Sequence, residues 1–95
     1  MEFEFSGKIF EWRGPAPFFY IQLPADIAHE ISLMAKQLTY GWGVIPAAAV
    51  IGKTSFTTSL FPKDGGYLLG LKVAVRKPEN LQLGDCPNVS ISFDI

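Results

Sequence analysis

The chain has 95 residues, 48% of them apolar, and its eight lysines and arginines nearly balance nine acidic residues, for a formal net charge of −1. This apolar content excludes a disordered segment, and the lack of a basic excess disfavours a protein that holds nucleic acid by its phosphates. A chain of this length has room for one core, so we expect a single domain over residues 1–95.

The single cysteine, Cys86, rules out an intrachain disulfide and with it a secreted disulfide scaffold. We expect its side chain to be buried or half-buried. Residues 1–5 alternate acidic and aromatic side chains, which is unlike a signal peptide. The longest weakly polar stretch, residues 44–51, contains Pro46 and is too short to span a bilayer. These features predict a cytoplasmic protein with no membrane segment.

Residues 2–12 predict a strand, because aromatic and acidic side chains alternate at its start. The alternation slips further along, where Phe10 and Trp12 fall on the formerly polar face. Strands of small barrels coil in order to close, so we expect a bulge or bend near Gly7 and Phe10.

Residues 13–17 form a turn by composition, and residues 18–23, rich in aromatic and β-branched side chains, predict a second strand. Pro24 suits the start of a helix, and we expect that helix over residues 25–37. Its buried face is predicted from apolar side chains at helical spacing, which are Ile27, Ile31, Met34 and Leu38.

A β-hairpin is predicted from residues 44–51 and 54–60, which are joined by a tight turn at Gly52-Lys53. Residues 62–66 form a second loop, with Asp64-Gly65 as its turn signal.

Residues 67–76 alternate again and predict another strand. Its apolar side chains, which include Leu71 and Val73, face inward, and Lys72 and Arg76 share the opposite face. The last strand is predicted to begin at Asn88, because the preceding Pro87 cannot donate to a ladder. Its inward face consists of Val89, Ile91, Phe93 and Ile95.

These segments predict a mainly β fold, a small closed or partly open barrel of about six strands with one α-helix near residues 25–37. A barrel is favoured over an open sheet because closure leaves few exposed strand edges.

Seven short features in order along nearly the whole chain resemble a family of small bacterial and archaeal domains of unknown function, DUF1905. They are Trp12-Arg13-Gly14-Pro15, Leu23-Pro24, Gly41-Trp42-Gly43, Ile45-Pro46, Thr58-Ser59-Leu60-Phe61-Pro62, Tyr67 with Leu71-Lys72-Val73-Ala74-Val75-Arg76-Lys77, and Gly84-Asp85. The resemblance implies a double-split β-barrel, similar to the barrels of AbrB-type transcription factors and MazE-type antitoxins. It implies almost nothing about activity.

Lys72 and Arg76 are the strongest candidates for binding, since two cations on one strand face, with small Ala74 between them, suit a phosphate or carboxylate. Arg13 is expected to join them from the first loop. The alternative is that these cations form an ordinary solvated strand face.

The aromatic candidates are Trp12, Trp42, Tyr20 and Tyr67, and the two tryptophans complete the candidate surface. Trp42 lies between two glycines, which let a backbone approach a ligand closely, and Trp12 ends the first strand. The alternative for Trp42 is a side chain that closes the end of the barrel.

No catalytic constellation is visible in the sequence. His29 is the only histidine, and it falls on the polar helix face with Asp26 and Glu30, where we expect solvated side chains. Thr58-Ser59 has no glycine elbow and no base to activate a hydroxyl. The sequence therefore predicts no enzyme activity, no metal and no cofactor.

The leading hypothesis is a non-enzymatic binding module that holds a small anion or a protein partner with Trp12, Arg13, Trp42, Lys72 and Arg76. The alternative is a nucleic-acid-binding regulator, which rests on the likeness to AbrB-type barrels and is disfavoured by the charge. We expect a monomer or a weak homodimer.

Overall fold

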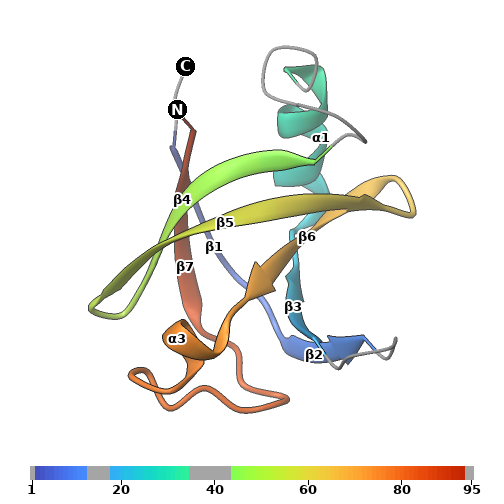
Figure 1. The fold of residues 1–95 in the computed structure, drawn as a ribbon. Helices are drawn as coiled ribbons and strands as arrows, with labels where there is room; N and C mark the ends of the chain where they lie inside the picture. The colour runs from blue at the N-terminus through green and yellow to red at the C-terminus, as the bar shows by residue number, and fades with distance from the viewer. Residues whose placement is uncertain (1, 13–17, 35–43, 94–95) are drawn as a thin grey trace.

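The computed structural model describes residues 2–12, 18–34 and 44–93. Within them, a single antiparallel sheet of seven strands, in the order β1-β7-β4-β5-β6-β3-β2, curls into a half-barrel, accompanied by two helices (Figure 1). The prediction of a mainly β, partly open barrel is confirmed. The described residues contain one strand and one helix more than the sequence predicted.

The strands are β1 (Glu2–Ser6), β2 (Ile9–Trp12), β3 (Phe18–Gln22), β4 (Ile45–Ile51), β5 (Thr54–Lys63), β6 (Gly66–Leu71) and β7 (Asn88–Ser92), and the helices are α1 (Ala25–Leu33) and α3 (Val73–Arg76). The predicted start of the last strand at Asn88 is confirmed.

The additional strand arises because the segment predicted as one bent strand breaks at Gly7 and Lys8. Its halves, β1 and β2, occupy the two edges of the sheet. A Cβ at Gly7 would lie 2.5 Å from Cγ2 of Ile21, so the chain passes this corner of the barrel only with a glycine there. The sequence predicted the position of this change of direction correctly, but the chain forms two separate strands there and not one bent strand.

Both predicted turns are confirmed as two-residue connections. Gly52 has φ +59°, and Asp64 and Gly65 have φ values of 51° and 80°. The loop predicted over residues 62–66 is shorter, because Pro62 continues β5. The β4–β5 ladder ends at Leu60, so Pro62, which has no N–H, removes no hydrogen bond to β4.

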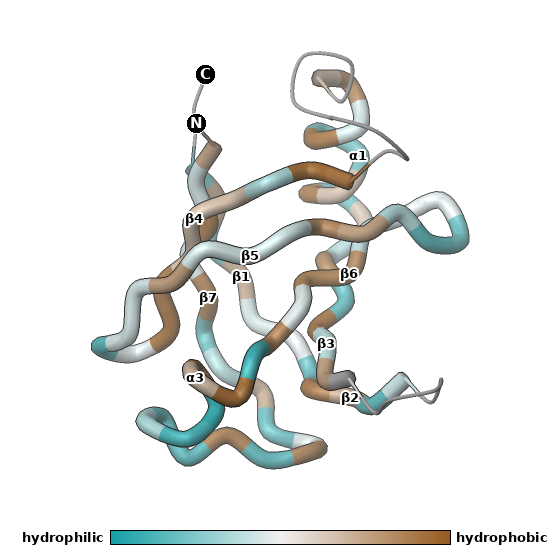
Figure 2. The backbone as a smooth tube through the Cα atoms, in the orientation of Figure 1, coloured by the Kyte–Doolittle hydropathy of each residue, from teal (hydrophilic) through white to brown (hydrophobic). Residues whose placement is uncertain are grey.

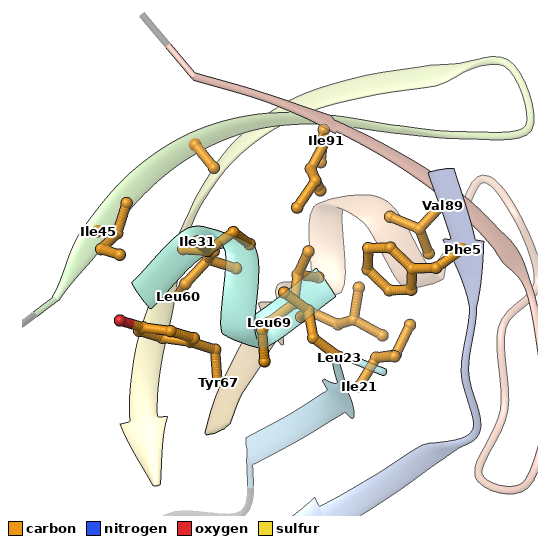
Figure 3. Close-up of a cluster of buried hydrophobic side chains, with 14 of the residues drawn as sticks. Phe5, Ile21, Leu23, Ile31, Ile45, Leu60, Tyr67, Leu69, Val89 and Ile91 are labelled. Atoms are coloured by element: carbon orange, nitrogen blue, oxygen red, sulfur yellow. The ribbon is translucent and has the colours of Figure 1, made fainter. Parts of the chain in front are cut away.

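The core fills the concave side of the sheet, where apolar side chains from the strands and α1 converge (Figure 3). Strand β4 shows the alternation most simply, with every second residue buried. Hydrophilic residues gather instead at the tips of the β4–β5 and β5–β6 hairpins and along the loop after α3 (Figure 2). The period-two patterns thus predicted the faces of most strands correctly.

Helix α1 covers one end of the barrel and buries Ala28 and Ile31 against the core. It begins after Pro24, as predicted, but ends at Leu33 rather than at residue 37. The N–H of Met34 bonds to the carbonyl of Ile31 at 3.0 Å, which tightens the last turn and ends the helix; residues 35–37 lie outside the described ranges. No helix among the described residues is long and apolar enough to cross a membrane.

Helix α3 replaces the second half of the strand predicted over residues 67–76. Pairing of β6 with β5 ends at Leu69, and pairing with β3 ends at Leu71. Beyond that point no strand among the described residues lies beside it, so the backbone bonds locally, from the N–H of Arg76 to the carbonyl of Lys72 at 3.1 Å. The alternation of valines suggested a strand, but the tertiary environment overrode it.

The Tyr67 side chain is buried in the core, and this burial raises the pKa of its hydroxyl. The folded state therefore holds the phenolic proton more tightly than the unfolded chain, whose pKa is near 10.0. We expect stability to be constant below that pH and to fall as the pH rises toward the higher folded-state pKa. Urea unfolding between pH 8 and pH 11.5 measures this, and Tyr67→Phe should lose much of the alkaline decline.

Candidate functional site

A cleft opens where strands β5 and β6 part. The two strands pair from Lys63 opposite Gly66 as far as Leu60 opposite Leu69, and β6 then bends away toward α3 (Figure 1). At the point of divergence the hydroxyl of Thr58 donates to the carbonyl of Gly70 at 2.7 Å. A side chain thus takes the place of a ladder hydrogen bond, and the strands separate beyond it.

The cleft has a volume of about 780 Å³, a size that suits a small ligand or a short peptide segment. Its lining divides into three groups: apolar walls, a row of hydroxyls on β5, and two cations. The apolar walls are formed by Phe19, Tyr20, Pro46, Phe61, Gly70, Leu71 and Val73, the hydroxyl row by Thr57, Thr58 and Ser59, and the cations are Lys72 and Arg76.

Gly70 forms the part of this surface where the walls come closest. A Cβ at this position would lie 3.5 Å from Cε2 of Phe61, 3.6 Å from Oγ1 of Thr58 and 3.8 Å from Cε1 of Tyr20. Tyr20 and Phe61 also meet edge to face, with ring centroids 6.0 Å apart. The missing side chain therefore leaves a hollow lined on two sides by aromatic rings.

Arg76 is held against the wall of the cleft by stacking. Its guanidinium carbon lies 3.8 Å from the centroid of the Phe19 ring, within the range of a cation–π contact. Its Nε is buried, and no hydrogen-bond partner for it is found in the described part of the chain. The guanidinium is therefore positioned by an aromatic face while one of its donors stays unsatisfied.

The electrostatics of the cleft are one-sided. Two of the described lining residues are cations, and none is an aspartate or glutamate. Within residues 2–12, 18–34 and 44–93, neither Lys72 nor Arg76 forms an ion pair with a carboxylate. A protein of net charge −1 thus concentrates, at one apolar cleft, two positive charges that no carboxylate of the described residues pairs with.

Lys72 and Arg76 come together for a different reason from the one the sequence suggested. They were predicted to share a strand face, but Lys72 caps α3 and Arg76 lies four residues later, one helical turn away. Val73, predicted to face the core, is 50% exposed and lines the cleft. The two cations thus line the same cleft, and the error of the sequence prediction was to continue the strand beyond Leu71.

The other predicted site residues lie elsewhere. Trp12, on the edge strand β2, is not among the described residues that line the cleft. The Trp12 ring instead contacts Lys63, whose Nζ lies 3.2 Å from the ring centroid. Arg13 and Trp42 lie outside the described residues. Of the five candidates, the described structure brings together two.

The remaining chemistry-bearing side chains do not gather. Asp26, His29 and Glu30 are exposed on α1, as predicted, and Thr58 uses its hydroxyl to join the strands. No group of three or more potential metal ligands occurs in the described ranges. Cys86 is exposed, which contradicts the expectation of a buried side chain; it lies in the irregular loop before β7 rather than in a strand.

Sequence reasoning named Tyr20 as an aromatic candidate but missed Phe19, Phe61 and Gly70. A signal was present, because Phe10 and Trp12 disturb the polar face of the first segment, and Phe10 does pack against Tyr20 with ring centroids 6.2 Å apart. Aromatic side chains on a face that ought to be polar indicate an apolar surface outside the core. The sequence did not indicate which strands would share that surface.

Comparison with known protein families finds a match. The model of a domain of unknown function (DUF1905) matches residues 5–91 of this chain. A search of curated proteins found no relative.

Proposed function

We propose that this chain, which belongs to the DUF1905 family, is a binding module whose cleft between β5 and β6 holds a ligand with an anionic group beside an apolar one. The observation that carries the proposal is the pair of cations, Lys72 and Arg76, unpaired with any described carboxylate at the mouth of an apolar cleft. A carboxylate or phosphate would supply the missing partner.

The walls of the cleft support an apolar group in the proposed ligand. The aromatic rings of Tyr20 and Phe61 surround the hollow at Gly70, and Phe19 lies under the guanidinium. Binding sites typically combine mainly apolar surface with a few polar groups that orient the ligand. Among the described lining residues none is a histidine or a carboxylate, which favours binding over acid–base catalysis.

A nucleic-acid-binding role has less support. The net charge is −1, and tight duplex binding needs several phosphates to be neutralised together. The likeness to AbrB-type barrels concerns the fold, and a fold does not determine function.

The proposal predicts selective loss of binding on charge reversal. The probe is 3-phenylpropionate, which joins a carboxylate to an aromatic ring, titrated into the protein and followed by amide chemical shifts. Lys72→Glu should weaken binding roughly tenfold, because an attraction is replaced by a repulsion. Lys77→Glu is the matched control, since it makes the same change in net charge at an exposed lysine that is not among the described cleft-lining residues, and should change the affinity by less than about twofold.

Three results would contradict the proposal. One is the absence of any shift around Gly70 and Arg76 on titration. Another is an equal loss of affinity in Lys72→Glu and Lys77→Glu, which would mean that only the net charge of the protein matters. The third is equal binding of the neutral analogue 3-phenylpropanol, which would remove the role of the cations.

A further inference from the structure

Strand β5 has an unpaired edge along the cleft. The closing pairs of the two hairpins fix the direction of the backbone hydrogen-bonding groups of β5. These pairs are Ile51 with Thr54 in the β4–β5 hairpin and Lys63 with Gly66 in the β5–β6 hairpin. In an antiparallel ladder alternate residues direct their N–H and C=O groups to opposite sides. Even-numbered residues of β5 therefore face β4, and odd-numbered residues face β6.

The last pair of the ladder with β6 is Leu60 opposite Leu69, which leaves Ser59 opposite Gly70. The odd-numbered residues before it, Ser55 and Thr57, have no strand beside them in the described structure. Their backbone donors and acceptors point toward the cleft, and Thr57 lines it. This edge carries none of the usual blocks to strand pairing, because residues 54–59 include no proline and no charged side chain.

Both ends of the open edge are closed by side chains. The carboxylate of Glu79 accepts hydrogen bonds from the N–H of Lys53 at 3.3 Å and from the hydroxyl of Thr54 at 2.6 Å. At the other end Thr58 donates to the carbonyl of Gly70. The open edge from Ser55 to Thr57 is about 7 Å long at the usual rise of a strand, enough for an extended segment of roughly three residues.

The wall opposite this edge is α3, which contributes Val73 and Arg76, with Lys72 at its start. A groove between a strand edge and a helix is a recurrent site for peptide recognition by strand addition, in which backbone hydrogen bonds supply affinity and side-chain pockets supply specificity. We infer that the ligand is an extended peptide that pairs with the β5 edge at Ser55 and Thr57 and sets a carboxylate against Lys72 and Arg76. This inference rests on the proposed function, because it names the class of ligand for the same cleft.

Charge complementarity selects an acidic peptide over a neutral or basic one, since the described lining holds two cations and no carboxylate. An apolar side chain of the peptide would pack against the cleft wall formed by Tyr20 and Phe61. The carboxylate could come from the C-terminus or from an aspartate or glutamate side chain, and the experiment separates these sources.

The test begins with a library of random heptapeptides displayed with free C-termini, panned against the full chain. Enriched sequences are expected to combine an acidic group with an apolar residue. The best peptide is then synthesised in three forms: with a free C-terminus, with a C-terminal amide, and with alternate backbone amides N-methylated. N-methylation removes donors for strand pairing and should weaken binding at least tenfold, whereas amidation weakens it only if the terminal carboxylate is the anchor.

The matched protein variants are Thr57→Pro and Thr57→Ala. The N–H of Thr57 faces the cleft and not β4, so proline should remove a docking donor and leave the β4 ladder intact. We expect Thr57→Pro to weaken peptide binding about tenfold more than Thr57→Ala does. Both variants remove the hydroxyl, but only proline removes the backbone N–H. If Thr57→Pro does not fold, the N-methylated peptide on the wild-type chain decides the question.

If 3-phenylpropionate binds but no peptide is enriched, or if N-methylation has no effect, the strand-addition inference is wrong and the proposed function stands. If neither probe binds, the proposed function fails and the inference fails with it. A peptide that loses affinity on N-methylation, and with Thr57→Pro where that variant folds, establishes strand addition.

Discussion

Replacing Ile91 with alanine is expected to lower the free energy of unfolding by about 3–4 kcal/mol. The side chain is fully buried on β7, the strand between β1 and β4, and points into the core (Figure 3). Its removal leaves a cavity that a sheet paired on both sides cannot collapse to fill. Urea denaturation followed by circular dichroism measures the change, which is a large share of the stability of a domain of this size.

Val73→Ala is the control for this prediction. The alternation of residues 67–76 predicted that Val73 faces the core like Ile91, but its side chain is 50% exposed on α3. We therefore expect a loss within about 0.5 kcal/mol. If Val73→Ala lowers the free energy of unfolding as much as Ile91→Ala does, Val73 is buried in a strand, as the sequence predicted, and does not lie exposed on α3.

Replacing Gly52 with alanine is expected to cost about 2–4 kcal/mol, for two reasons. Its φ of +59° lies in the left-handed region, which penalises any residue with a Cβ by about 1–2 kcal/mol. The added Cβ would also overlap the carboxylate of Glu79, which must move and give up its hydrogen bonds to Lys53 and Thr54.

Gly65→Ala separates these two causes. Gly65 has φ +80°, but a Cβ there would meet nothing within 4 Å, so only the backbone cost of about 1 kcal/mol applies. The difference between the two variants measures the clamp that Glu79 forms between the β4–β5 turn and the loop after α3. Equal losses would show that Glu79 moves aside freely. Combining Gly52→Ala with Glu79→Ala should cost less than the sum of the single changes, because both remove the same contact.

Within the candidate site, the sequence led to the two cations but not to the cleft. Lys72 and Arg76 are four residues apart, and that spacing places them on one side in a strand, where the period is two, and nearly so in a helix, where it is 3.6. Their pairing was therefore insensitive to the error in secondary structure. The aromatic walls come from β3 and β5, which are distant in sequence, and no local pattern relates Tyr20 to Phe61.

What the sequence determined by itself is local: the alternation that gives most strands a buried face, the two-residue turns at Gly52-Lys53 and Asp64-Gly65, and the start of α1 after Pro24. These follow from side-chain period and backbone preference, which act over a few residues. Only the tertiary structure decided where strands stop pairing. Beyond Leu71 no strand of the described chain lies beside the β6 backbone, which forms α3 instead. The resulting separation of β6 from β5 creates both the cleft and the open edge at Ser55 and Thr57.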